Sequence, residues 1–165
     1  MTPIHVDVAI IGSGTAGMGA YRGARVHADS DLLIEGGVFG TTCARVGCMP
    51  SKLLIAAAEV AHQARHADPF GVHVNDVVVD GAAVMAQVRR ERDSFVGFVM
   101  ESVDSIPPGD RLTAKVSFQD ANTLLTEQGQ ALEYSNCAST RSTAIAYWSS
   151  KKRTALSNSG NLKIL

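Results

Sequence analysis

An α/β fold is predicted by the order in which three kinds of segment follow one another along this chain. Two short apolar runs, 5–11 and 31–35, enclose a stretch with helical character. Longer helical segments follow over 51–66 and 81–105, and short strand-like runs begin only after residue 110. Strands that alternate with helices pair in parallel. We therefore expect a parallel sheet with helices, and a small antiparallel sheet inserted after the second long helix.

The composition is that of an ordinary globular protein. Its 165 residues are 45% apolar and 19% charged, which is enough for one domain with a buried core. The net charge of −1 gives no electrostatic reason to expect nucleic acid or a membrane surface as a partner. We expect a cytoplasmic location, because no apolar run approaches the roughly 18 residues that span a bilayer and the N-terminus has no secretory leader pattern.

The first predicted unit is a strand, a glycine-rich turn and a helix. Residues 5–11 have the β-branched, apolar pattern of a short strand buried in a parallel sheet. The turn that follows has the sequence Gly12-Ser13-Gly14-Thr15-Ala16-Gly17. In a dinucleotide-binding turn the first glycine permits the tight turn, the second lets the backbone approach a pyrophosphate, and the third lets the helix pack closely on the strand. A helix over 15–26 would then point its N-terminal amides at the phosphates.

An acidic residue ends the second predicted strand. Glu35 closes the run 31–35, about twenty residues beyond the glycines. A carboxylate in that place accepts hydrogen bonds from an adenosine ribose diol and repels a 2′-phosphate. The pattern therefore favours FAD or NAD over NADP. The alternative for Glu35 is a solvated strand end that binds nothing.

Two cysteines, Cys43 and Cys48, lie just downstream with four residues between them. Three cysteines in a reducing compartment do not make a structural disulfide framework, so a close pair is either redox-active or metal-binding. Zinc ligands normally stand two to four residues apart and need a second cluster, and no second Cys or His pair in the sequence completes such a site. A redox pair is therefore favoured over a zinc half-site.

The local sequence predicts a bend at these cysteines. A turn of helix that begins near Thr41 would bring the two side chains roughly one and a third turns apart, and Gly47 would allow the distortion that a disulfide needs. Pro50 cannot make an ordinary helical hydrogen bond. We therefore expect a kink at Pro50 and a new helix over 51–66.

The segment Gly40-Thr-Thr-Cys43-Ala-Arg-Val-Gly-Cys48-Met-Pro-Ser-Lys52 resembles the redox-disulfide segment of the flavin-dependent disulfide reductases, most closely the dihydrolipoamide dehydrogenases. The resemblance extends from about Val6 to Ala146. It implies a Rossmann-like FAD-binding domain in which two sulfurs cycle between disulfide and dithiol beside the flavin, which exchanges electrons with a nicotinamide. One residue departs from the pattern, because the family usually has Asn two residues after its first cysteine and this chain has Arg45.

The resemblance also implies roles for individual residues. Cys43 corresponds to the outer thiol that exchanges with a substrate disulfide, and Cys48 to the inner thiol that contacts the flavin. Lys52 corresponds to a lysine near the flavin that stabilises the charge of the reduced ring; the alternative is a helix-surface lysine. The expected cofactor-binding residues are Gly12, Ser13, Gly14, Thr15, Ala16, Gly17, Glu35, Gly36, Gly40, Thr41, Thr42 and Lys52. No metal site is expected.

The middle of the chain carries three further patterns. His62 and His66 fall one helical turn apart, but without a third ligand at suitable spacing we interpret them as solvated. An apolar stripe marks a core or an interface along the helix 81–105; it consists of Val84, Val88, Phe95, Val99 and Val103. The runs 111–118, 123–126 and 131–134 predict short antiparallel strands, similar to the sheet that the family inserts in its FAD domain.

The resemblance stops near Ala146. In relatives a strand at this place, here 142–146, ends in Ala-Thr-Gly, whereas this chain continues with Tyr147-Trp148. If TAC encodes Tyr147, removal of one nucleotide after Ala146 restores Thr-Gly, so we hypothesise a one-base frameshift; a natural short paralogue is the alternative. Residues 147–165 contain no acidic residue and match no secondary-structure period. We expect an FAD-binding domain over 1–146, incomplete at its C-terminus, and a disordered tail over 147–165.

The sequence thus predicts the FAD-binding, dithiol-bearing part of a dihydrolipoamide dehydrogenase-like enzyme. By resemblance, the complete relative is a homodimer that converts dihydrolipoamide and NAD to lipoamide and NADH. It also has an NAD domain, a later Gly-Asp motif, an interface domain and a His-Glu pair from the partner subunit. This chain lacks those parts, so we expect it to be inactive alone. The alternatives are a glutathione- or mercuric-reductase-like member, a non-catalytic dinucleotide-binding module, and a thiol sensor without flavin.

Overall fold

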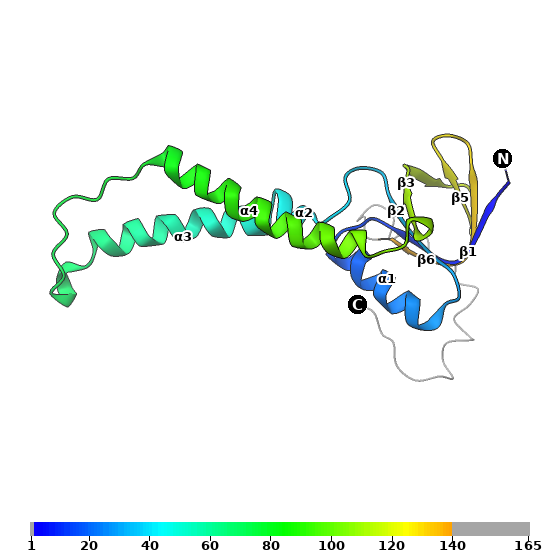
Figure 1. The fold of residues 1–165 in the computed structure, drawn as a ribbon, viewed down its shortest axis with the longest axis horizontal. Coiled ribbons are helices and arrows are strands. Elements are labelled where there is room, and N and C mark those ends of the chain that lie inside the picture. Colours follow the sequence, from blue (N-terminus) through cyan, green and yellow to red (C-terminus); the bar gives the residue numbers. More distant parts are fainter. Residues whose placement is uncertain (1, 140–165) are drawn as a thin grey trace.

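A computed structural model describes residues 2–139 and shows a mixed sheet, a helix packed on it and a long helical hairpin (Figure 1). The strands are β1 (Ile4–Ile11), β2 (Asp31–Glu35), β3 (Arg111–Thr113), β4 (Val116–Phe118), β5 (Thr123–Thr126) and β6 (Ala131–Ser139). The helices are α1 (Thr15–His27), α2 (Thr42–Arg45), α3 (Cys48–Arg65) and α4 (Gly81–Asp104), with the 3₁₀ turns η1 (Asp68–Phe70) and η2 (Pro108–Asp110). None of the helices in this described part combines the length and apolarity needed to cross a membrane.

One sheet of six strands contains both the parallel and the antiparallel parts. Its strand order is β3-β2-β1-β6-β5-β4. The first four strands in that order pair in parallel, whereas β6, β5 and β4 pair antiparallel. The predicted α/β class, with a parallel sheet and a small antiparallel insertion, is confirmed. The two parts are continuous because β6 belongs to both.

Strand β6 is longer than the predicted run 131–134. It continues to Ser139 and pairs in parallel with β1, from Ile4 opposite Leu132 to Ile11 opposite Ser139. The sequence suggested a later strand over 142–146 for the return to the parallel sheet. That segment lies outside the described residues, as do the tail 147–165 and the position of the hypothesised frameshift.

The prediction of antiparallel strands over 111–118 is wrong for its first half. β3 pairs in parallel with β2, from Leu33 opposite Arg111, and the antiparallel part begins only with β4. The two residues between β3 and β4 bond to different edges: the amide of Ala114 donates to the Glu35 carbonyl (3.0 Å), and the Lys115 carbonyl accepts from the amide of Glu127 (3.0 Å). Two residues reach only about 7 Å, yet they join strands at opposite ends of the strand order. The sheet must therefore curl until its edges meet.

The curled sheet has an apolar core on each face. The cluster inside the curl combines residues from the parallel and antiparallel parts: Ala9, Leu32, Ile34, Leu124, Leu132 and Tyr134. The cluster on the outer face joins the sheet to α1 and to the end of α4: Ile10, Met18, Tyr21, Leu33, Val103 and Ile106. Burial of both faces explains the continuous apolar runs 8–11 in β1 and 32–34 in β2, whereas the first half of β1 alternates, with His5 and Asp7 between apolar residues.

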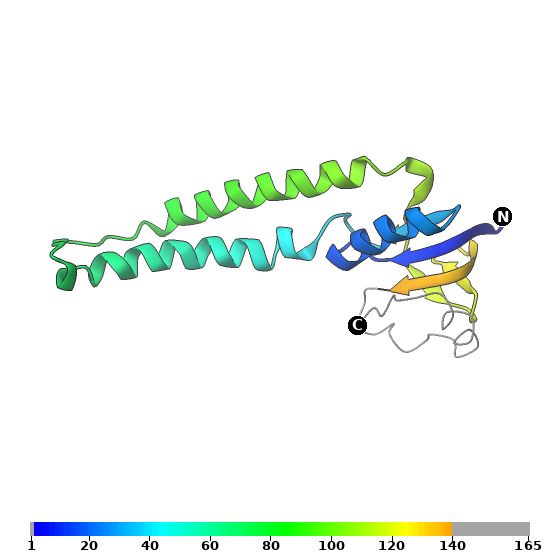
Figure 2. The same cartoon turned by 90° about the horizontal axis from the view of Figure 1, so that it is seen from below.

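The helices α3 and α4 form a hairpin that projects from the sheet (Figures 1 and 2). Asp80 is the N-cap of α4: its carboxylate accepts from the amides of Ala82 (2.9 Å) and Ala83 (3.0 Å) in the first turn. α3 contains no buried residue, and α4 buries only Val88 and Val103. The hairpin is therefore joined to the body of the protein at its base alone.

The apolar stripe predicted along α4 is only partly a core. Val103 is fully buried and Val88 is 6% exposed, whereas Phe95 remains 38% exposed. Large apolar side chains are exposed along the rest of the hairpin as well: Leu54, Ile55, Val60, Phe70, Val72, Val78, Val79 and Phe98. The stripe is thus buried at Val88, within the hairpin, and at Val103, at its base, and is exposed at Phe95 between them.

Candidate functional site

The glycine-rich turn leaves the carboxyl end of β1 and enters α1. Gly12 has a φ of 101°, a left-handed conformation that favours glycine, and its amide donates to the Ile34 carbonyl of β2 (2.7 Å). Gly14 is the N-cap of α1, and a Cβ added there would meet nothing within 4 Å. Gly17 is buried on the sheet side of α1. The three glycines thus occupy the turn, the open approach and the packed position that a dinucleotide site requires.

The N-terminus of α1 is open to a ligand. No side chain within the described residues caps it, and Thr15 and Ala16 in its first turn are exposed. The first amides of a helix have no partner inside the helix and lie at the positive end of its dipole. They therefore fit the phosphates of a dinucleotide.

Glu35 lies beside the glycine turn, as predicted, and is engaged by protein donors. Its Oε2 accepts from both the amide (2.8 Å) and the hydroxyl (2.9 Å) of Ser13, and its Oε1 accepts from the amide of Gly37 (3.0 Å). Each carboxylate oxygen can accept two hydrogen bonds. Oε1 therefore retains an acceptor position with which Glu35 can bind a ribose hydroxyl.

Ser13 connects the turn to the segment that leads to the cysteines. It is fully buried, and its hydroxyl oxygen accepts from the amide of Gly40 (3.2 Å) while its proton is donated to Glu35. Gly36 follows Glu35 and packs closely against Lys115, because a Cβ at position 36 would lie 2.9 Å from Cγ of Lys115. The predicted residues Ser13, Glu35 and Gly40 are thus brought together by direct hydrogen bonds.

The segment after Gly40 forms the one-turn helix α2. Thr41 is its N-cap, and the Thr41 hydroxyl accepts from the amide of Ala44 (3.0 Å). The Thr42 carbonyl accepts from the amides of Val46 and Gly47 (3.0 Å each), which ends the helix. In this structure Thr41 and Thr42 therefore have clear structural roles, whereas their predicted contact with a cofactor stays a prediction.

The bend between the cysteines lies at Val46 and Gly47, so the predicted kink at Pro50 is wrong. Helix α3 begins at Cys48 and is continuous through Pro50. Pro50 is the third residue of α3, and a helix amide at that position has no partner within the helix, so proline costs no hydrogen bond there. The amide of Ser51 makes the first bond across this turn, to the Gly47 carbonyl (3.2 Å).

The two sulfurs lie near one another at the junction of α2 and α3. Cys43 is half-buried and Cys48 is exposed, and both are free thiols. A hydrogen bond to the Cys48 side chain is the largest cause that raises the pKa of Cys43, followed by desolvation, while the charge of Lys52 acts in the opposite direction. The structure therefore brings Cys43, Cys48 and Lys52 into one cluster. The greater exposure of Cys48 differs from the expectation that Cys43 is the more accessible thiol.

Arg45 makes contacts that the sequence did not predict. Its Nη2 donates to the Phe39 carbonyl (2.9 Å) and to Sδ of Met100 on α4 (3.2 Å). The only signal in the sequence was that Arg45 departs from the family pattern. Met100 lies 55 residues away along the chain, and no local pattern could have paired the two.

The histidine pair at the end of α3 has no third ligand side chain within the described residues. The rings of His62 and His66 lie 4.1 Å apart, and Nδ1 of His66 is 2.8 Å from the His62 carbonyl. Nowhere among residues 2–139 do three or more His, Cys, Asp or Glu side chains gather as metal ligands would.

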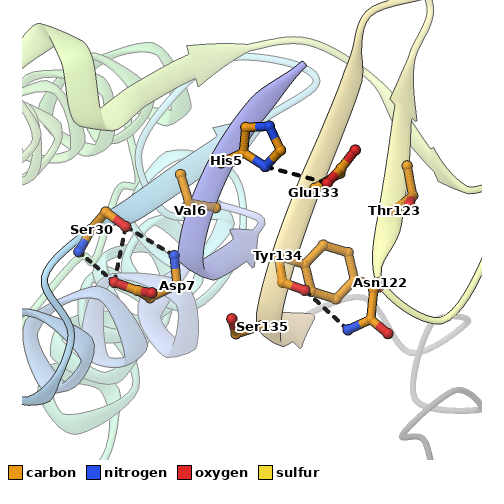
Figure 3. A pocket seen from close by; sticks show the side chains of 9 residues that line it. All are labelled: His5, Val6, Asp7, Ser30, Asn122, Thr123, Glu133, Tyr134 and Ser135. Atoms are coloured by element: carbon orange, nitrogen blue, oxygen red, sulfur yellow. Dashed lines mark hydrogen bonds and ion pairs between the residues drawn. The ribbon is translucent and has the colours of Figure 1, made fainter.

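An open pocket of about 330 Å³ lies at the opposite end of the sheet from the glycine turn (Figure 3). Its polar side chains are bonded within the protein: His5 pairs with Glu133 (3.2 Å), the Ser30 hydroxyl donates to Asp7 (3.0 Å), and the Asn122 side-chain amide donates to the Tyr134 carbonyl (3.0 Å). Ligands of parallel α/β sheets bind at the carboxyl ends of the strands. Because this pocket is at the amino end of β1, it is not part of the candidate site.

Comparison with known proteins agrees with this geometry. The sequence pattern of the pyridine nucleotide-disulphide oxidoreductases matches residues 6–138. The chain belongs to this family. Among curated members, a dihydrolipoyl dehydrogenase of Chlamydia muridarum is 39% identical over 97 residues, which are 56% of this chain and 21% of that protein. A mercuric reductase of Streptomyces lividans is 40% identical over 92 residues, 55% of this chain and 19% of that protein.

A solved member of the flavoprotein disulfide reductases shares the fold. The HOCl-induced flavoprotein disulfide reductase RclA from Escherichia coli aligns with a TM-score of 0.57 at 19% identity, over 81% of this chain and 27% of that chain. A dihydrolipoyl dehydrogenase of Geobacillus stearothermophilus is 28% identical over 79% of this chain and 27% of its own length. This chain thus spans roughly a fifth to a quarter of the length of these relatives.

Proposed function

We propose that this chain is the FAD-binding, dithiol-bearing part of a dihydrolipoyl dehydrogenase-like flavoprotein disulfide oxidoreductase. The observation that carries the proposal is the cluster of Cys43, Cys48 and Lys52. A short loop joins this cluster to β2, and the hydrogen bond from Gly40 to Ser13 attaches that loop to the glycine turn at the carboxyl end of β1. Ser13 joins the two parts by its hydrogen bonds to Glu35 and Gly40. A dithiol beside a dinucleotide turn suits transfer of two electrons between a thiol pair and a bound dinucleotide.

The residues of the glycine turn would hold the cofactor. Gly12 and Gly14 leave the backbone open, the amides at the start of α1 would bind the pyrophosphate, and Oε1 of Glu35 would accept from the ribose. FAD, when bound, supplies the two-electron acceptor that passes reducing equivalents to NAD. Lys52 lies one turn into α3, and its charge lowers the pKa of Cys43.

The two cysteines would exchange a disulfide bond with a dithiol substrate. Cys48 is the first residue of an 18-residue helix, where negative charge on a sulfur is stabilised by the outward-pointing amides. Its exposure leaves the sulfur accessible to the planar face of a cofactor. In the dihydrolipoyl direction a substrate thiolate would attack the Cys43 sulfur of the Cys43–Cys48 disulfide and release Cys48 as a thiolate. In the reverse direction the half-buried Cys43 would be the thiol that attacks the substrate disulfide, as the family resemblance implies. Deprotonation of Cys43 limits that attack, because only a thiolate is an effective nucleophile.

The substrate we propose is a dihydrolipoyl group, because dihydrolipoyl dehydrogenases recur among the similar curated proteins. A mercuric reductase-like activity is the second candidate function, because one mercuric reductase is 40% identical over the aligned residues. In either case we propose that NAD-binding and subunit-interface regions, as in a homodimeric relative, are needed for turnover. The domain would comprise residues 1–146, with 147–165 as a separate tail, and this chain alone would turn over poorly.

An absorption spectrum tests the proposal. The purified chain is titrated with FAD under anaerobic conditions and then reduced with dihydrolipoamide. We expect a protein-bound flavin band and, after two-electron reduction, a long-wavelength shoulder that Cys48→Ser abolishes while FAD stays bound. A non-catalytic module would bind FAD with an identical response in wild type and Cys48→Ser. A flavin-free thiol sensor would bind no FAD and yet close its disulfide, seen as a loss of two mass units.

A further inference from the structure

We propose that Arg45 is a positioning residue of the dithiol: its guanidinium fixes the one-turn helix α2, and with it Cys43, where the Cys43 sulfur meets that of Cys48. This inference rests on the proposed function, since it assigns a role in the chemistry of the same two thiols. Arg45 lies two residues after Cys43, at the C-terminal end of α2.

Helix α2 needs an external support to hold its place. It has only four residues, and an isolated helical turn is not stable in water. The Thr41 hydroxyl caps its start, and the amides of Val46 and Gly47 share the Thr42 carbonyl at its end. All of these bonds are local to residues 41–47. They shape the turn but do not attach it to the rest of the protein.

Arg45 attaches this turn to the preceding loop and to the distant helix α4. A single nitrogen, Nη2, donates to the Phe39 carbonyl (2.9 Å) and to Met100 Sδ (3.2 Å). The guanidinium passes close to Gly40, where a Cβ would lie 3.4 Å from Nη2 and 3.4 Å from Cγ1 of Val99. Nε of Arg45 is buried and has no hydrogen-bond partner within residues 2–139. The group is thus enclosed between the loop and α4, where an ionic hydrogen bond is strong.

The loop that Arg45 holds is the loop that the dinucleotide turn also holds. The amide of Gly40 donates to the Ser13 hydroxyl, which donates to Glu35. A continuous path of bonds therefore runs from Glu35 through Ser13 and the loop 39–40 to Arg45 and α4. The charge of Lys52 acts on Cys43. The role we assign to Arg45 is instead to fix a position, because its hydrogen bonds join the loop to α4.

Equilibration with a glutathione redox buffer tests the role. The Cys43 and Cys48 sulfurs form one S–S bond while the S–S bond of glutathione disulfide breaks, and the two thiol protons leave on two molecules of glutathione. Acid quenching, alkylation and peptide mass mapping give the oxidised fraction of this pair apart from Cys137. The equilibrium constant measures how well the fold holds the two sulfurs together.

Arg45→Met keeps the length and apolar stem of the side chain but removes its donors. We expect the equilibrium constant for disulfide formation to fall about tenfold, as for loss of one charge-assisted hydrogen bond, which is about 30 mV for a two-electron couple. Arg45→Lys provides one cationic nitrogen that can serve both acceptors, and it should recover most of the loss. Arg65→Met, at the exposed end of α3, is the matched control and should leave the constant unchanged.

The two levels of the hypothesis fail in different ways. If the wild-type chain never forms the Cys43–Cys48 disulfide, the proposed function is wrong and this inference with it. The second case is that wild type forms the disulfide and Arg45→Met has the same equilibrium constant for its formation, whether or not the melting temperature falls. Arg45 is then only structural, and the inference is wrong. If Arg45→Met does not fold, Met100→Leu decides, because it removes one acceptor outside the dithiol segment. A constant equal to wild type in that variant also contradicts the inference.

Discussion

The ionisation of Cys43 is governed by its immediate neighbours. The hydrogen bond with the Cys48 thiol raises the pKa of Cys43 above its ordinary value, with desolvation as the second cause, and the charge of Lys52 opposes them. Only the thiolate reacts with iodoacetamide, so the rate of alkylation reports this pKa. We expect Cys48→Ala to lower the pH midpoint of Cys43 alkylation and Lys52→Met to raise it.

Peptide mass mapping after timed alkylation measures Cys43 separately from Cys137. The two variants form a pair with opposite expected signs, so a general loosening of the segment cannot produce both results. A midpoint that stays the same in Cys48→Ala would contradict the contact between the two sulfurs.

A buried carboxylate elsewhere makes stability depend on pH. The Asp31 side chain at the start of β2 is 1% exposed, and its Oδ2 has no hydrogen-bond partner in the described part of the chain. Desolvation raises the pKa of Asp31 above 3.8, although Arg25, 3.3 Å from Oδ1, lowers it in part. The folded state therefore holds the Asp31 proton more tightly than the unfolded state does. The resulting stabilisation is complete below pH 3.8 and is lost as the pH rises through the folded pKa.

We expect Asp31→Asn to remove this dependence. The free energy of unfolding of the variant minus that of wild type should increase as the pH rises from about 3.8 through the folded pKa, and then stay constant. Urea unfolding at a series of pH values measures it, with the exposed neighbour Asp29→Asn as the control. A difference that does not change with pH would show that Asp31 titrates alike in the two states.

Individual site residues could be predicted from sequence only where a motif fixes them. The spacing of the glycines and Glu35 placed them at one end of the sheet, and the structure puts them there. The hydrogen bonds of Ser13 to Glu35 and Gly40 bring together three separate segments, and no pattern within one segment encodes them. The contact of Arg45 with Met100 was unpredictable for the same reason.

At the scale of elements, helix boundaries near proline were the least predictable feature. The sequence predicts a break at Pro50, yet Pro50 occupies the first turn of α3, where its missing amide has no consequence. The break at Val46–Gly47 depends on two amides that share the Thr42 carbonyl. Local propensity cannot distinguish these cases, because a proline that begins a helix and one that interrupts it have the same neighbours in sequence.

Substitutions at two adjacent positions test the start of α3. Pro50→Ala should change the free energy of unfolding by no more than about 1 kcal/mol, because it removes no hydrogen bond and only loosens the unfolded chain. Ser51→Pro should cost about 3 kcal/mol, because it removes the bond from the Ser51 amide to the Gly47 carbonyl and clashes there. Urea unfolding measures both, and Ser51→Ala corrects for the side chain. If the two substitutions lowered the free energy of unfolding equally, α3 would not begin at Cys48.

For the whole molecule, the sequence predicts that parallel and antiparallel strands are both present, but it does not predict how the sheet curls until its two edges meet. Apolar runs indicated β1 and β2, and turn residues indicated the antiparallel strands. The run 111–118 divides between the two edges of the sheet, because Ala114 bonds to β2 and Lys115 bonds to the turn after β5. That closure depends on pairings between strands far apart in the chain. The same limit applies to the hairpin, whose apolar stripe does not reveal which of its positions are covered.

The exposed tip of the hairpin should therefore contribute little to the stability of this chain. Val78 is 88% exposed near the tip, whereas Val103 on α4 is fully buried against the outer face of the sheet. The same substitution at both sites separates burial from residue type. Val103→Ala should lower the free energy of unfolding by about 1.5–3 kcal/mol, because it uncovers core, whereas Val78→Ala should change it by less than about 0.5 kcal/mol. Urea unfolding of the two variants measures this at a protein concentration where sedimentation shows a single species. A cost at Val78 comparable with that at Val103 would mean that the tip is packed in solution, and the hairpin would then be part of the core rather than an arm projecting from it.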